Sequence, residues 1–96
     1  MKLIHITKPE FVTSILKNGL KSDSEGFVYL CENILDFDFI AYTVLGYNEY
    51  SVISVEVDES FLSPDETCET YPDGMYKHHG DILPSKLKLL LPIVHI

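Results

Sequence analysis

Residues 3–10 decide the fold of this chain and read Leu3-Ile4-His5-Ile6-Thr7-Lys8-Pro9-Glu10. The first four residues are apolar apart from one histidine, so they predict a short strand at or near the centre of a sheet. Thr7 stands three residues before Glu10, with Pro9 in the first turn, and this spacing is typical of a capping box that opens a helix. The stretch therefore predicts a strand that leads directly into a helix.

The next residues predict the body and the end of that first helix. Apolar side chains fall on one helical face, and they are Phe11, Val12, Ile15 and Leu16. Gly19 follows Asn18 and suits the left-handed backbone conformation in which helices commonly end. We therefore expect the helix to end at this glycine.

Two strands and a second helix are predicted after a polar loop. Residues 27–31 are rich in aromatic and branched side chains and predict a strand. Asn33 is the expected N-cap of a helix over residues 34–45, which is apolar nearly all round and should be largely buried. Residues 50–58 alternate between two phases and predict the clearest strand of the chain.

The last third of the chain predicts one long loop and a final strand. Residues 59–84 are punctuated by prolines and glycines, and a loop of this length in a small protein is usually functional. Residues 86–96 predict one strand, or two short ones interrupted at Pro92. The order of elements predicts an α+β fold in which a mixed or antiparallel sheet is flanked by two helices.

Length and composition favour one small intracellular domain. The chain has 96 residues, which is the size of a single domain over residues 1–96. Its two cysteines form no zinc-binding or disulfide pattern, which fits a reducing compartment. No stretch approaches the roughly 20 apolar residues that span a membrane. We expect a cytoplasmic protein without a membrane partner.

The net charge of the chain indicates which kinds of partner it favours. Fifteen acidic residues face seven basic ones, for a formal net charge of −8. A field of this sign repels phosphate backbones and disfavours direct nucleic-acid binding. It suits docking on a basic surface, although acidity in bacterial and viral proteins often serves solubility alone.

Three residues are candidates for ligand binding. His5 and Thr7 project from the same side of the first strand and present an imidazole and a hydroxyl together. Tyr29 lies in the second strand, where its ring could stack on a flat heterocycle. The structural alternatives are a buried, hydrogen-bonded histidine, a helix-capping threonine and ordinary packing of the tyrosine.

The segment from Tyr76 to Pro84 is the densest polar cluster and supplies candidate catalytic groups. His79 and Asp81 flank a glycine and could act as a general acid or base. The structural alternative is a turn in which Asp81 caps the backbone and the histidines are solvated. Adjacent side chains diverge and no third ligand has suitable spacing, so a metal site is not predicted.

Several of these segments together resemble ADP-ribosyltransferase-like domains, in particular their small bacterial and phage branches, which include DNA-modifying toxin transferases and RNA 2′-phosphotransferases. The resemblance lies in the His-x-Thr of the first strand, the helix Phe-Val-x-Ser-Ile-Leu-x-x-Gly-Leu, the strand Val-Tyr-Leu-Cys-Glu and the later Tyr-x-x-x-Gly-Asp-Ile-x-Pro-x-x-Leu. It implies that His5 and Thr7 hold the ribose of NAD and that Tyr29 stacks against the nicotinamide.

The resemblance also implies a carboxylate late in the sheet, usually a glutamate, that orients a ribose hydroxyl and supports an oxocarbenium-like transition state. No glutamate falls in residues 76–87, and Asp81 is the nearest carboxylate, with His79 as an alternative acid or base. Glu49 imitates the family motif locally but comes too early in the chain order.

Two functions are expected from these features. The first is an ADP-ribosyltransferase-like protein that binds NAD and transfers ADP-ribose to a macromolecular acceptor. The second is a catalytically degenerate, acidic interaction module or inhibitor, for example a phage anti-defence protein, that binds a basic, nucleic-acid-handling partner. A 2′-phosphotransferase is disfavoured because all seven basic residues are lysines and none is an arginine.

Overall fold

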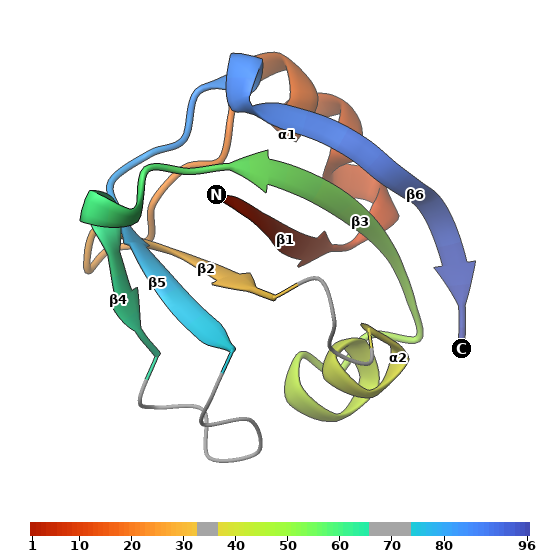
Figure 1. The fold of residues 1–96 in the computed structure, drawn as a ribbon. Coiled ribbons are helices and arrows are strands. Elements are labelled where there is room, and N and C mark those ends of the chain that lie inside the picture. Colours follow the sequence, from red (N-terminus) through yellow and green to blue (C-terminus); the bar gives the residue numbers. More distant parts are fainter. Residues whose placement is uncertain (33–36, 66–73) are drawn as a thin grey trace.

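The computed structural model describes residues 1–32, 37–65 and 74–96, apart from the side chain of Val44, and contains a six-stranded sheet. The strand order is β4-β5-β2-β1-β3-β6, and every pair of neighbours is antiparallel. The predicted α+β class, with an antiparallel sheet flanked by two helices, is confirmed (Figure 1). No helix in the described ranges is long and apolar enough to cross a membrane.

The strands are β1 (Lys2–Thr7), β2 (Phe27–Cys31), β3 (Glu49–Glu56), β4 (Leu62–Pro64), β5 (Met75–His79) and β6 (Leu87–His95). The α-helices are α1 (Val12–Asn18) and the short α2 (Phe37–Phe39), which continues as the π-helix η2 (Ile40–Val44). Single 3₁₀ turns are η1 (Pro9–Phe11), η3 (Glu59–Phe61) and η4 (Pro84–Lys86).

β1 lies at the centre of the sheet, as its apolar sequence predicts, but its two edges are paired very differently. Along β3 its ladder runs without a break from Lys2↔Glu56 to Thr7↔Ser51. With β2 it pairs at one position, Ile4↔Cys31. The sheet therefore consists of two three-stranded parts, β4-β5-β2 and β1-β3-β6, joined through this pair (Figure 1).

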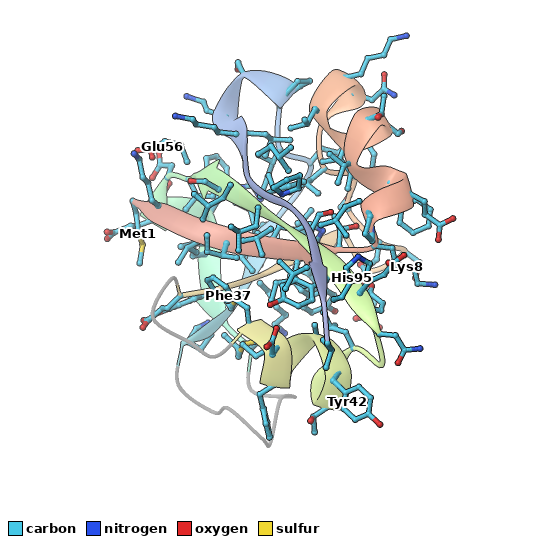
Figure 2. All side chains as sticks on the ribbon, turned by 90° about the vertical axis from the view of Figure 1, so that its right-hand side faces the viewer. Met1, Lys8, Phe37, Tyr42, Glu56 and His95 are labelled. Carbon is cyan, nitrogen blue, oxygen red and sulfur yellow. The ribbon has the colours of Figure 1, made fainter. Side chains whose placement is uncertain are left out.

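The core is divided between the two faces of the sheet, because successive strand residues point to opposite sides. Leu3 of β1 packs in one cluster, with Ile53 of β3 buried beside it and Ile15 of α1 against it. Ile4 and Ile6 belong to the second cluster, which contains Ile40 and Ala41 of η2. Figure 2 shows β1 between these layers, with Met1 beside Glu56 at one end and Lys8 near His95 at the other.

The predicted capping box of Thr7 and Glu10 is wrong. Thr7 is the last residue of β1, buried and paired with Ser51, so its backbone belongs to the sheet ladder. The chain then enters η1 from Lys8, which makes no side-chain cap, and α1 begins only at Val12. Local capping preference has been overridden by strand pairing.

The described part of the second helix is less buried than its sequence predicts. Its expected N-cap, Asn33, lies outside the described residues, and the described helical part runs from Phe37 to Val44. Ile40 and Ala41 face the sheet and are buried, whereas the side chains of Phe39 and Tyr42 are 40% and 60% exposed. One face of this helix packs on the core and the other stays in solvent.

The predicted loop over residues 59–84 is also wrong, because it contains two strands. β4 and β5 pair with each other and β5 continues the sheet along β2. The final segment forms the single strand β6, which contains Pro92. The pairing of β6 with β3 shifts register between Tyr50 and Ile53 of β3. The hydroxyl of Ser51 donates to the carbonyl of Pro92, and this edge position tolerates a residue without an N–H.

Gly19 ends α1 as predicted, with a φ of +88°. The glycine lets the chain turn directly into Leu20, which forms a two-bond bridge with Ile82: Leu20 N to Ile82 O is 2.9 Å and Ile82 N to Leu20 O is 2.8 Å. A Cβ at Gly19 would lie 2.3 Å from the Ile82 carbonyl oxygen. Both the backbone conformation and the close approach therefore require glycine.

We expect Gly19→Ala to lower the free energy of unfolding more than Gly80→Ala does. Gly80 has a similar φ of +89° but open space around its Cβ position. Its substitution should cost about 1–2 kcal/mol for the positive φ. Gly19→Ala should cost a further 1–3 kcal/mol or so, because the backbone carbonyl of Ile82 must move. Urea unfolding of the two variants measures the difference, and equal losses would contradict the close approach.

Candidate ligand-binding cleft

A cleft of about 680 Å³ lies where β1 and β2 stop pairing. His5 of β1 and Tyr29 of β2 line it, together with Ile15 of α1 and Ile40 of η2. Its volume falls within the range of about 300–1,000 Å³ that is usual for small-molecule sites. Most of its lining is apolar, and among the described lining residues Lys21 and Asp23 are the oppositely charged pair.

His5 crosses the gap between the two strands. Its Nδ1 lies 3.1 Å from the backbone carbonyl oxygen of Tyr29. Because a carbonyl only accepts, Nδ1 carries the hydrogen and donates it, and in the neutral ring Nε2 is then an acceptor. Burial lowers the pKa of His5, and this outweighs the opposite effect of the Tyr29 carbonyl. His5 is therefore a neutral imidazole at pH 7 that can accept a hydrogen bond.

Tyr29 offers the largest exposed ring of the two strands that flank the cleft. Its side chain is 39% exposed although it sits in mid-strand. Its hydroxyl interacts electrostatically with the carboxylate of Asp23. Partial loss of hydration raises the pKa of Tyr29, and the negative charges of Asp23, Glu25 and Asp65 raise it further. The phenol is therefore protonated at neutral pH, and Lys77 of β5 is its direct cross-strand neighbour.

Asp23 is a site residue that the sequence reasoning missed. Its Oδ1 accepts the N–H groups of Glu25 at 2.9 Å and Phe27 at 3.1 Å. These bonds, the one to Phe27 first, lower the pKa of Asp23 and outweigh the residual desolvation. An aspartate three residues before Gly26 is a recognisable turn signal. The turn could have been predicted from it, but not the position of Asp23 on the lining of the cleft.

Thr7 does not join His5 in the cleft. The two residues share a face of β1, as alternation requires, but Thr7 is only 4% exposed and is not among the residues that line the cleft. It lies beyond the end of the β2 pairing and opposite Ser51 of β3. The structure thus brings His5 and Tyr29 together and places Thr7 in the packed interior.

His79 and Asp81 do not reach the cleft either. Nε2 of His79 lies 2.8 Å from the hydroxyl oxygen of Ser63, and its ring packs edge-on against Phe27. Asp81 accepts from the N–H and hydroxyl of Ser22 at 2.7 and 2.8 Å, and the N–H is the main cause that lowers the pKa of Asp81. β5 pairs with β2 on the side away from β1, so β2 separates these residues from His5.

Cys31 lines the cleft but is not a nucleophile. Its side chain is buried, and burial raises the pKa of its thiol to about 12. The thiolate, which is the reactive form, is therefore absent at neutral pH. In the parts of the chain that the structure describes, no group of three or more His, Cys, Asp and Glu side chains could hold a metal ion.

No family model, curated protein or solved structure matches the chain, so the fold and the cleft alone define its class. It is a small α+β protein whose antiparallel sheet is divided by an apolar cleft. The recognition elements of this cleft are a neutral imidazole, an exposed phenol ring and one anchored carboxylate.

The protonation state of His5 can be measured by NMR titration of its imidazole resonances, assigned with His5→Gln. We expect a pKa below the 6.5 of an unfolded chain. Below about pH 6.5 the unfolded chain then takes up this proton before the folded protein does, so stability falls as the pH falls through the folded pKa. The variant should lack this contribution. A pKa at or above 6.5, or a hydrogen on Nε2 in the neutral ring, would contradict the assigned hydrogen bond.

Proposed function

We propose that this protein is ADP-ribosyltransferase-like and binds NAD with its nicotinamide and adjoining ribose in the cleft between β1 and β2. The observation that carries the proposal is that the His5 ring contacts the backbone carbonyl of Tyr29 and that both residues line this cleft. These are two of the three positions to which the family resemblance gives the ribose and nicotinamide contacts. They reach one site from strands separated by 24 positions in the sequence.

The chemistry of the two side chains fits these roles. A ribose hydroxyl is a hydrogen-bond donor, and Nε2 of neutral His5 is an acceptor because Nδ1 is engaged by the Tyr29 carbonyl. The exposed face of Tyr29 offers a platform for a flat heterocycle. Lys21 also lines the cleft, and its ammonium lies 3.8 Å from the carboxylate of Asp81.

Transfer would break the bond between the ribose C1′ and the nicotinamide nitrogen and form a bond from C1′ to a nucleophile on the acceptor. Nicotinamide leaves with the bonding electron pair, and the acceptor gives up its proton. Positive charge develops on the ribose, and fixed negative groups stabilise it. We propose a macromolecular acceptor, and the opening of the cleft beside the exposed Tyr29 leaves room for one.

NAD should raise the melting temperature, and His5→Ala should abolish the shift. A ligand at ten times its Kd adds about 1.4 kcal/mol to stability. In a protein of this size that corresponds to a shift of roughly 6–11 °C. Differential scanning fluorimetry with NAD measures it. Tyr29→Phe should keep the shift because the ring remains, whereas Tyr29→Ala should weaken binding by about tenfold through loss of stacking.

His95→Ala is the matched control for this experiment. The His95 side chain is 76% exposed, pairs with Glu49 and lies outside the cleft, so its loss should leave the NAD shift unchanged. No shift of the wild-type protein at millimolar NAD, or equal shifts for wild type and His5→Ala, would overturn the proposal.

A second candidate function, an acidic interaction module or inhibitor, is favoured by the surroundings of His79 and Asp81. Both are engaged outside the cleft, by Ser63 and by Ser22. Asp81, the nearest carboxylate to the one that the family resemblance implies, is thus engaged by the N–H and hydroxyl of Ser22. A chain with a net charge of −8 would then serve by docking on a basic protein partner.

This second function predicts salt-sensitive binding to basic polypeptides that does not depend on the cleft. A decalysine peptide should bind in 50 mM salt and lose affinity steeply toward 500 mM, because exposed charges are screened. His5→Ala and Asp81→Ala should bind as the wild type does, each removing at most one of the fifteen acidic groups. Isothermal titration calorimetry tests it. Binding that is insensitive to salt, or that His5→Ala destroys, would exclude it.

A further inference from the structure

A second, smaller pocket is lined by the chain that follows β3 and by the end of β5 with the chain that follows it. Three of its lining residues, Val57, His78 and Ile82, are buried. Two more are exposed apolar side chains, Phe61 at 50% and Leu83 at 67%. The pocket has a volume of about 230 Å³. Small-molecule sites usually measure about 300–1,000 Å³, so this pocket suits a single side chain of a partner.

His78 brings one available nitrogen to this pocket. The residue lies in β5 and is only 7% exposed. Its Nδ1 lies 2.9 Å from the carbonyl oxygen of Gly80, which only accepts, so Nδ1 donates. Nε2 has no hydrogen-bond partner among the described residues, and no fully buried side-chain nitrogen or oxygen among them lacks one. Nε2 is therefore reached from solvent, on a residue that lines the pocket.

The surface beside that nitrogen is apolar and partly aromatic. The ring centroid of Phe61 lies 5.7 Å from that of His78, and the two planes are tilted by 35°. Ile82 and Leu83 add aliphatic surface. Aromatic rings pack favourably against other rings and aliphatic groups. An occupant must also give Nε2 a polar partner, because a nitrogen that loses its water without replacement costs free energy.

A tyrosine side chain meets both requirements. Its hydroxyl donates to Nε2 when the His78 ring is neutral and accepts from Nε2 when the ring is protonated, so the contact forms in both states. An indole N–H can only donate, and a phenylalanine ring has no polar atom. Tyrosine is also one of the residues that most often anchor one protein in a pocket of another.

The charged side chains around the pocket favour basic neighbours of that tyrosine only weakly. Glu56, Asp58 and Asp81 line the pocket, and Lys86 is the lysine among its described lining residues. The N-terminal ammonium lies 3.5 Å from Glu56, and the Lys21 ammonium lies 3.8 Å from Asp81. Long-range attraction of a basic partner therefore comes from the net charge of −8, and the pocket supplies the specific contact.

We propose that the pocket of Phe61, His78 and Leu83 is the anchor site for a tyrosine side chain of a basic protein partner. This inference rests on the second candidate function and names the contact by which the partner is recognised. The tyrosine ring packs on Phe61 and Leu83, and its hydroxyl bonds to Nε2 of His78. None of the described residues of this pocket lines the cleft, so the anchor does not depend on NAD.

The experiment uses three peptides in which five lysines stand on each side of a central tyrosine, phenylalanine or alanine. Isothermal titration calorimetry in about 50 mM salt measures their dissociation constants. We expect the tyrosine peptide to bind about fivefold more tightly than the phenylalanine peptide, which is the effect of one hydrogen bond. The phenylalanine peptide should bind about tenfold more tightly than the alanine peptide through burial of its ring.

Two variants separate the contributions of the nitrogen and the apolar surface. His78→Phe keeps a ring but removes Nε2, so it should lower the affinity of the tyrosine peptide to that of the phenylalanine peptide and leave the other two peptides unchanged. Leu83→Ala should weaken the tyrosine and phenylalanine peptides by about threefold each and leave the alanine peptide unchanged. Leu90→Ala is its matched control, because Leu90 is exposed on β6 and does not line the pocket.

Circular dichroism and melting temperature check that each variant is folded, and Leu83→Ala tests the site even where the loss of the bond to Gly80 unfolds His78→Phe. The anchor is overturned by equal affinities of wild type for the tyrosine and phenylalanine peptides, by a tyrosine preference that survives His78→Phe, or by equal effects of Leu83→Ala and Leu90→Ala. Salt-sensitive binding of the alanine peptide would then leave the second candidate function intact. If none of the peptides binds the folded wild type, that function falls, and the anchor falls with it.

Discussion

The structure depends on the unequal pairing of β1, which has a complete ladder with β3 and one pair with β2. Backbone N–H and C=O groups need partners wherever they are withdrawn from water, so a ladder that stops must be replaced by something else. Here the imidazole of His5 donates to the Tyr29 carbonyl. A side chain thus takes over where the strand pairing ends, and the space beside it is the cleft.

This replacement explains why the cleft combines an apolar lining with a few fixed polar groups. Residues that would pair across a continuous sheet instead face an opening, so Ile6 and its would-be partner Tyr29 line it. The polar groups are each tied to backbone: His5 to a strand carbonyl and Asp23 to the amides of its loop. Groups fixed in this way keep their position when a ligand enters, which lowers the cost of binding.

The sequence predicted those features that depend on local periodicity. β1, β2 and β3 follow from short runs of apolar and branched residues, and the end of α1 follows from Gly19. The start of α1 could not be predicted in the same way, because Thr7 satisfies both a helix cap and a sheet ladder, and the ladder with Ser51 prevails. β5 was missed because its lysine and histidines resemble a loop, although His78 is buried and Lys77 is half-buried in a paired strand.

The residues of the candidate site also differ in whether their positions can be predicted from the sequence. The sequence predicted that His5 and Tyr29 belong to one cleft, and both line the cleft because β1 and β2 are neighbouring strands. Asp23 could not be placed, since its position depends on how a loop returns to β2. Asp81 was expected beside His5, but strand order puts β2 between them.

The polar segment after β5 connects two distant segments of the chain, a structural role that its composition does not indicate. Asp81 binds the backbone and hydroxyl of Ser22, and the adjacent Ile82 exchanges two hydrogen bonds with Leu20. These contacts tie the chain between β5 and β6 to the segment that follows α1. Leu20 lines the cleft, so its bridge with Ile82 holds one wall of the cleft in place. Asp81 fixes the neighbouring Ser22, and an aspartate therefore need not touch a ligand to matter for the site.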